Sequence, residues 1–251
     1  MIAISHPGKI GDCLYTLPTV RELCRLNNCK ADFYTSECCR SIFDFLKQQE
    51  CISDVIIPSD YNIEGYGCGV QPWSMSIPSN SYSNVYQLGF QRVPDKSLPE
   101  FIAESAGLDR SIGNNLFYDL KSKQNNYEDY YVIAPRGRTS FHNFFVYLSK
   151  ELFNLNKKVY IIGGQNEFDS DYIEFAENKT GGTYLEMIDI IAHSKAFIGI
   201  LSSPLVVANG FNMKKYVPYN SAWDMSHSVY KSETKYSIEP SIKECIEWVL
   251  S

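Results

Sequence analysis

The sequence contains no apolar run that approaches the roughly 18 residues needed to cross a bilayer. Its first residues also lack the basic segment followed by a long apolar segment that marks a signal peptide. We therefore expect a cytoplasmic protein with no secretion signal and no stable membrane insertion.

The cysteines lack the spacing of a metal site or a disulfide scaffold. None of the eight cysteines belongs to a CxxC pair, and only four histidines are present. Disulfide scaffolds belong to secreted proteins, which this sequence does not resemble. We interpret the cysteines as reduced thiols, several of them buried, and we expect no bound metal and no cofactor.

An excess of positive charge and several common motifs are also missing. The formal net charge of -6 provides no general attraction to nucleic acid or to an anionic membrane surface. The GxGxxG fingerprint of nicotinamide-binding folds, the GxxxxGK[ST] P-loop and the GxSxG elbow of serine hydrolases are all absent. These absences argue against three large enzyme classes.

What the sequence does contain is an alternation of short apolar runs with segments of helical spacing. In the first half this pattern predicts strands at 1–5, 31–36 and 52–59, and helices at 13–29, 39–49 and 97–108. Pro18 fits the first of these helices only in its first turn or at a kink. The stretch 60–83 has no periodicity and is expected to be an irregular insertion.

The second half repeats the alternation after a polar linker. Strands are predicted at 130–135, 157–164, 196–201 and 213–219, and helices at 144–156, 166–178, 184–194, 203–211 and 238–250. We therefore predict an α/β protein with two facing Rossmann-like domains, residues 1–124 and 125–251, each with a parallel sheet. The expected ligand site is the cleft between them.

The loop "GKIGD" at residues 8–12 follows the first strand and precedes a helix. The partial positive charge of a helix N-terminus favours the ionised form of Asp12, which could then accept a proton from an attacking hydroxyl. Aspartate at such a position is also a frequent helix cap. Both interpretations of Asp12 are open at this point.

Three loops of the second half contain groups suited to a nucleotide. The stretch "APRGRTSFHN" brings two cations, hydroxyls and a histidine in front of a helix, a combination suited to a diphosphate: Arg136, Arg138, Thr139, Ser140 and His142. Solvated arginines on a polar loop are the alternative. Ser202 and Ser203 precede another helix, where an ordinary serine cap is the alternative.

The stretch "IIGGQNEFD" places Gly163 and Gly164 after a strand, where the backbone can approach a ribose or a base, with Glu167 as an acceptor for ribose hydroxyls. Asp169 and Asp171 form an acid pair of the kind that binds a metal nucleotide in some transferases. They lie within the helical pattern at 166–178, which argues against that role.

With these stretches in order, the chain resembles the heptosyltransferase family of glycosyltransferases, which transfer heptose from ADP-heptose to lipopolysaccharide and have the two-domain GT-B fold. Three segments carry the resemblance: "GKIGDCLYTLPTVREL", "VIAPRGRTSFHNFFVYLSKEL" with "KKVYIIGGQNE", and "YLEMIDIIAHSKAFIGILSSPLVVANGF". They span both halves in the family's order.

The resemblance implies an inverting, metal-independent transfer of a hexosyl, heptosyl or pentosyl group from a nucleotide diphosphate to an acceptor hydroxyl. Asp12 matches the family's proposed general base, and Lys9 and Gly11 belong to the same acceptor-side loop. The first half would hold the acceptor, and the second half the nucleotide sugar, which is a co-substrate. Glu167 falls where the family commonly has a ribose-binding acid.

The chain also departs from the family pattern. His142 stands where the donor loop usually has a lysine, so Arg136 or Arg138 would supply the charge. The later loop usually reads Asp, then Ser or Thr, then Gly, followed by a histidine. This chain has Leu201 and Val206 in that region, which leaves the donor unidentified.

The leading hypothesis is a glycosyltransferase that acts on a glycan or a lipid-linked sugar, and two further hypotheses are open. The acceptor could be a hydroxymethylated pyrimidine in DNA, as in phage enzymes, with Tyr66, Trp73 and Tyr82 either stacking on a flipped base or packing internally. Alternatively, the protein could be a non-catalytic binder of nucleotide sugars or glycans. Retention of Asp12 in an intact loop argues against the binder.

Overall fold

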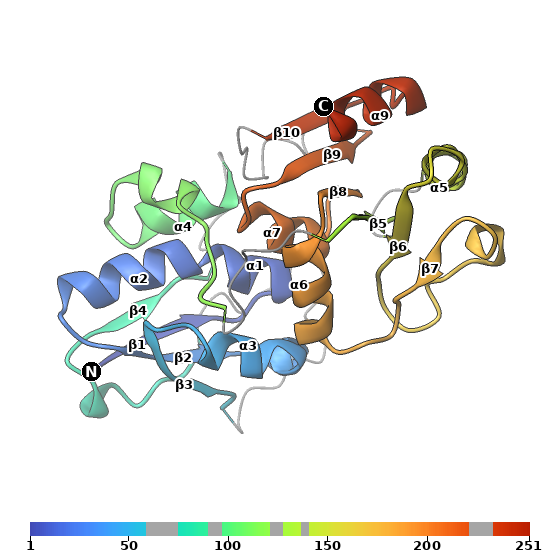
Figure 1. Cartoon of the computed structure of the whole chain (residues 1–251). Coiled ribbons are helices and arrows are strands. Elements are labelled where there is room, and N and C mark those ends of the chain that lie inside the picture. The colour runs from blue at the N-terminus through green and yellow to red at the C-terminus, as the bar shows by residue number, and fades with distance from the viewer. Residues whose placement is uncertain (59–74, 90–96, 121–127, 137–140, 221–232) are drawn as a thin grey trace. The chain divides into compact units, whose positions relative to one another are not determined.

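The computed structural model of the chain describes residues 1–58, 75–89, 97–120, 128–136, 141–220 and 233–251. The chain divides into two compact units, Met1–Lys121 and Ser122–Ser251. Each unit is an α/β layer structure around its own parallel sheet, as predicted (Figure 1). The acceptor and donor roles of the two halves remain predictions.

The first unit contains a four-stranded parallel sheet. Its strands are β1 (Ile2–His6), β2 (Ala31–Thr35), β3 (Ile52–Ile56) and β4 (Val85–Gln87), and their order across the sheet is β3-β2-β1-β4. The central strands β1 and β2 are buried along their whole length, which explains why their residues do not alternate between apolar and exposed polar ones. The sequence did not predict β4, because it is only three residues long and pairs with a strand that is distant in sequence.

Helices connect these strands. The elements are α1 (Ile10–Tyr15), α2 (Leu17–Leu26), the 3₁₀ helix η1 (Glu37–Ile42), α3 (Phe43–Lys47), the 3₁₀ turn η2 (Ser79–Ser81), α4 (Leu98–Ser105) and the 3₁₀ helix η3 (Arg110–Asn114). The helix predicted at 13–29 is in fact two helices, with Pro18 in the first turn of α2. The helix predicted at 39–49 corresponds to η1 followed by α3. In Figure 1, α1, α2 and α4 lie together on one side of the sheet.

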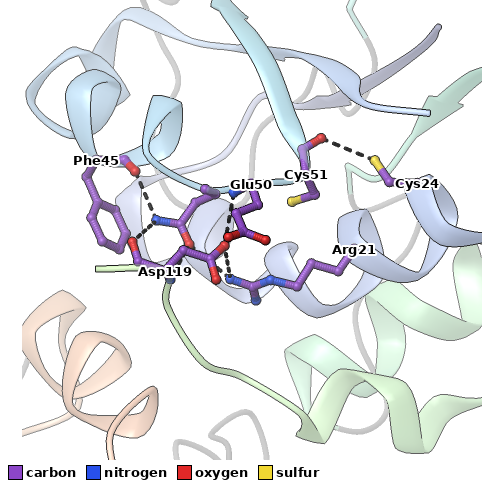
Figure 2. A network of polar contacts seen from close by, with 7 residues as sticks. Arg21, Cys24, Phe45, Glu50, Cys51 and Asp119 are labelled. Atoms are coloured by element: carbon purple, nitrogen blue, oxygen red, sulfur yellow. Dashed lines mark hydrogen bonds and ion pairs between the residues drawn. The ribbon is translucent and has the colours of Figure 1, made fainter. Parts of the chain in front are cut away.

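A partly buried polar network connects the last segment of the first unit to its helices (Figure 2). Arg21 of α2 donates to Gln49 at 2.9 Å and forms an ion pair with Asp119 at 3.4 Å. The Asp119 carboxylate also accepts the Glu50 amide hydrogen at 3.0 Å. The guanidinium of Arg21 lies 3.7 Å from the ring centroid of Phe117, so its charge is covered on one side by an aromatic face.

The second unit contains a six-stranded parallel sheet in the order β10-β9-β8-β5-β6-β7. The strands are β5 (Tyr130–Ala134), β6 (Lys158–Ile161), β7 (Glu177–Asn178), β8 (Ala196–Gly199), β9 (Lys214–Pro218) and β10 (Thr234–Ser237). Counted within the unit, this is the Rossmann order 3-2-1-4-5-6, in which the direction of winding reverses between β5 and β8.

The helices of the second unit cover both faces of this sheet. They are α5 (His142–Asn154), α6 (Tyr184–His193), α7 (Ser203–Asn209) and α9 (Ile242–Leu250). Figure 1 shows α5 and α9 on one side of the sheet and α6 and α7 on the other. Phe145 and Leu148 of α5 pack with Ile133 of β5 and Ile198 of β8 in the main hydrophobic core of this unit.

The helix predicted at 166–178 is wrong. This segment contains the 3₁₀ turn η4 (Ser170–Tyr172) and then β7. The Asp169 side chain accepts the Asp171 amide hydrogen at 3.2 Å, an aspartate turn that competes with continued helical hydrogen bonding. Tyr172 is nonetheless buried in the core, as an apolar face would require.

No helix within the described ranges is long and apolar enough to span a lipid bilayer.

Candidate functional site

The "GKIGD" loop lies at the carboxyl end of β1, where the winding of the first sheet reverses between β1 and β4. Ligands of open α/β sheets bind at such switch points, so the topology makes this loop a candidate site independently of its sequence. Lys9 is the residue before α1, and Asp12 is in the first turn of that helix. Lys9 is exposed, and Gly11 and Asp12 are partly buried.

The Asp12 carboxylate is both a cap and a perturbed acid. Its Oδ2 accepts the Lys9 amide hydrogen at 3.2 Å, which is the capping contact expected as the simpler interpretation. Burial raises the pKa of Asp12, and this rise is only partly opposed by His6 and by the amide and charge of Lys9. A carboxylate has two oxygens with several lone pairs, so a cap contact at Oδ2 leaves capacity to accept a proton.

Sequence reasoning missed His6, the last residue of β1. Its side chain is fully buried, and its Nδ1 accepts the Gly8 amide hydrogen at 2.9 Å. Burial lowers the pKa of His6 to about 4, although the charge of Asp12 opposes this shift. A Cβ added to Gly8 would lie 2.4 Å from Cε1 of His6 and 2.9 Å from Cβ of Asp12. Gly8 is therefore required because two side chains pack against it.

The segment after β2 supports the same loop from another side. The Gly8 carbonyl accepts from Ser36 Oγ at 3.3 Å and from the thiols of Cys38 and Cys39 at 3.4 Å each. Hydrogen bonding between the thiols and burial raise the pKa of Cys38 and Cys39, so both side chains are thiols rather than thiolates. All the cysteines that the structure describes are free, as predicted, and Cys68 lies outside the described residues.

The predicted donor loops of the second unit all follow the carboxyl-terminal ends of neighbouring strands in its sheet. Ala134, the last residue of β5, pairs with Gly199, the last residue of β8, and Ile133 pairs with Ile161 at the end of β6. The loops that follow these three strands therefore start side by side at the switch point. They contain Arg136, the Gly163–Gly164 turn, and Ser202.

Two side-chain contacts connect the first two of these loops. Arg136 lies 3.6 Å from the Asp169 carboxylate, and Nε2 of His142 lies 2.9 Å from Oδ2 of Asp171. The ligand atoms of His142, Asp169 and Asp171 lie within 4.8 Å of one another, which is close enough to hold a cation. Arg136 already supplies positive charge to this group, which disfavours a second cation.

Glu167 folds back onto the turn that was predicted to approach a ribose. Its Oε2 accepts the Gly164 amide hydrogen at 2.7 Å, and a Cβ on Gly163 would lie 2.2 Å from the same oxygen. The glycine at 163 therefore makes room for the Glu167 carboxylate. The other oxygen of Glu167 can still accept from a ribose hydroxyl.

The loop that contains Ser202 does not form an ordinary serine cap on α7. Ser202 occupies the position before α7, but its hydroxyl donates to the Ile200 carbonyl at 3.2 Å and does not cap the helix. Ser203 is the first residue of α7 and is partly buried. Leu201 is partly buried and Val206 is buried, where the family pattern has polar groups.

The predicted residues Arg138, Thr139, Ser140, Tyr66 and Trp73 lie outside the described residues. Tyr82 does belong to the structure, and it packs edge-on against Tyr34 with ring centroids 6.1 Å apart, and donates to Asp32 at 2.9 Å. Its ring therefore takes part in internal packing of the first unit.

No protein-family model matches the chain, and no curated protein matches it in sequence. Solved structures match it in fold. The E. coli heptosyltransferase WaaC with an ADP-2-deoxy-2-fluoro heptose has a TM-score of 0.63 at 12% identity, with 98% of each chain covered. E. coli ADP-heptose LPS heptosyltransferase II has a TM-score of 0.65 at 13% identity, covering 99% of this chain and 97% of that one.

A glycosyl transferase of family 9 from Veillonella parvula has a TM-score of 0.68 at 12% identity, covering 94% of this chain and 85% of that one. The match runs through both units in each case. The chain therefore has the fold of the heptosyltransferases, the GT-B architecture that the sequence predicted.

Proposed function

We propose that the protein is an inverting glycosyltransferase that moves a sugar from a nucleotide diphosphate to an acceptor hydroxyl without a metal ion. The observation that carries this proposal is the position of Asp12, an acid of raised pKa at the switch point of the first unit, in a chain with the heptosyltransferase fold. We propose a glycan or a lipid-linked sugar as the acceptor, held beside Lys9 and Gly11.

Asp12 is the proposed general base. Its carboxylate takes the proton of the acceptor hydroxyl while the hydroxyl oxygen forms a bond to the anomeric carbon of the donor. The bond between that carbon and the diphosphate oxygen breaks, and the diphosphate leaves with the electron pair. Because burial raises the pKa of Asp12, its carboxylate is a stronger base than that of an ordinary aspartate.

The edge of the second sheet is the proposed donor site. Arg136 supplies positive charge there and His142 an imidazole, and Arg138 and Thr139 of the same loop would add a second cation and a hydroxyl. These groups would stabilise the negative charge that develops on the departing diphosphate. Glu167 and the Gly163–Gly164 turn would bind the nucleoside. Ser202 and Ser203 would also contact the donor. Since WaaC was solved with ADP and an ADP-heptose analogue, ADP-sugars are the first donors to test.

The test is a transfer assay with Asp12→Asn, which keeps the size of the side chain. We expect kcat to fall by about 10²- to 10⁴-fold, the usual contribution of a general base. Nucleotide affinity should stay unchanged, and EDTA should leave the wild-type rate unaltered. The acid limb of the wild-type rate profile should lie above the ordinary aspartate pKa of about 4.

The matched control is Asp109→Asn. Asp109 also caps a helix of the first unit, because its carboxylate accepts the Ser111 amide hydrogen at 2.8 Å. A full loss of activity in Asp109→Asn would show that capping is what matters, and an active Asp12→Asn enzyme would remove the proposed base. A wild-type protein that binds nucleotide but releases no product from any sugar donor would favour the non-catalytic hypothesis.

A further inference from the structure

His6 is a buried polar side chain for which the proposed reaction has no role. It ends β1 two residues before Gly8 and lies with Asp12 against the same glycine. Its imidazole is completely enclosed, a costly place for a polar ring unless its nitrogen atoms are satisfied. The Nδ1 contact with the Gly8 amide, at 2.9 Å, meets this requirement on one side of the ring.

We propose that His6 is a positioning residue for Asp12: its neutral imidazole holds the Gly8 amide and thereby sets the path of the loop that carries the carboxylate. This inference rests on the proposed role of Asp12. Because Nδ1 accepts a hydrogen bond, the proton of the neutral ring lies on Nε2. A protonated ring would present two N–H groups, and Nδ1 could no longer accept from Gly8.

The packing explains why the loop responds to this contact. A Cβ on Gly8 would lie 2.4 Å from Cε1 of the His6 ring and 2.9 Å from Asp12 Cβ, so both side chains pack closely against Gly8. The Gly8 carbonyl is held at the same time by Ser36, Cys38 and Cys39. The peptide groups of Gly8 are therefore fixed at both the amide and the carbonyl, and Asp12 follows four residues later on α1.

A pair of variants separates the hydrogen bond from the volume of the ring. In His6→Asn, the side-chain oxygen can accept the Gly8 amide hydrogen in place of Nδ1, whereas His6→Phe fills the space without an acceptor. At saturating donor and acceptor we expect His6→Phe to lower kcat about 10- to 100-fold, the size of effect that misplacement of a catalytic group by about 1 Å produces. We expect His6→Asn to recover most of that loss, with KM for the donor within about threefold of wild type in both.

The control for general destabilisation is Val20→Ala, a change in the buried face of α2 that leaves the loop contacts in place. Its kcat should stay at the wild-type value while its melting temperature falls. A wild-type kcat in His6→Phe would overturn the inference, and so would equal losses in His6→Phe and His6→Asn.

A second measurement keeps the inference separate from the proposed reaction. Nitrogen-15 NMR of the wild-type imidazole at neutral pH should show a proton on Nε2 and none on Nδ1. The opposite tautomer would overturn the His6 contact whether or not the protein transfers sugar. Absence of transfer in the wild type, with the expected tautomer, would contradict the proposed reaction and leave the Gly8 contact standing.

Discussion

At the level of single residues, burial shifts the pKa values of His6 and Asp12 in opposite directions. Desolvation lowers the pKa of His6 to about 4 and raises the pKa of Asp12, so in each case the neutral form is favoured. The site is therefore built around a neutral imidazole and an acid whose deprotonation is made more difficult. These two shifts have opposite effects on how stability depends on pH.

The first prediction concerns this dependence. An unfolded histidine has a pKa of about 6.5, so at pH values between about 4 and 6.5 the unfolded chain binds a proton that folded His6 does not. The free energy of unfolding should therefore fall as the pH falls, by about 2 kcal/mol between pH 7 and pH 5 for this one group. Asp12 acts oppositely, because a raised acid pKa contributes stability that is lost as the pH rises through it.

Urea denaturation at pH 7 and pH 5 measures the effect in the wild type and in His6→Asn, whose side chain does not titrate. The difference in unfolding free energy between the two pH values should be about 2 kcal/mol smaller in the variant. An equal difference in both proteins would mean that His6 is not the group responsible.

Residues differ in how far the sequence could predict them. Asp12 and Arg136 were found because a strand, a loop and a helix start can be recognised locally, and because charged groups stand out there. His6 was missed because a single histidine at the end of an apolar run has no distinctive pattern. Its two-residue spacing from Gly8 becomes meaningful only when the ring is seen to accept the Gly8 amide hydrogen.

At the level of helices and strands, some elements could likewise be predicted from the sequence and others could not. The central strands were predicted because they are short, mostly apolar runs, and the long helices because their apolar residues recur at helical spacing. The helix expected at 166–178 was wrong because Asp169 forms a local turn with Asp171, a side-chain contact that hydrophobic spacing does not reveal. The strands β4 and β10 were missed because they are only three and four residues long. Their pairing with β1 and β9 defines them as strands, and a short local sequence does not reveal such pairing.

The second prediction concerns the loop between β1 and α1. Gly8→Ala places a methyl group 2.4 Å from the His6 ring and 2.9 Å from Asp12 Cβ, so these side chains must move. We expect a loss of about 1–3 kcal/mol in unfolding free energy, as for other overpacked sites. Sugar transfer should fall as well, because the displaced groups include the proposed base.

Gly107→Ala is the matched control. Gly107 follows α4 with φ of 75°, and an added Cβ there meets nothing within 4 Å. Its cost is therefore the backbone strain of an L-residue in the left-handed region, about 1–2 kcal/mol. Chemical denaturation and kcat should show two variants of similar stability that differ in turnover. Equal turnover in both would argue against the loop as the site of chemistry.

At the level of the whole molecule, two Rossmann-like units with separate switch points suit a reaction with two substrates. The fold could be predicted from the sequence because alternation of strands and helices is repeated in both halves. The particular donor could not, since Leu201 and Val206 stand where the family that the sequence resembles has the residues that would identify it. Direct binding measurements on the intact chain must therefore identify the nucleotide.

The last prediction is that one nucleoside diphosphate raises the melting temperature of the intact protein, with ADP tested first beside UDP and GDP. A ligand that binds only the folded state at about 100 times its Kd adds about 2.7 kcal/mol to the unfolding free energy. Arg136→Ala should reduce this shift, because it removes a cation from the proposed diphosphate site. Arg110→Ala, which removes an exposed arginine from η3 of the first unit, should leave the shift intact. Equal shifts in both variants would place the nucleotide away from Arg136 and would require a different donor site.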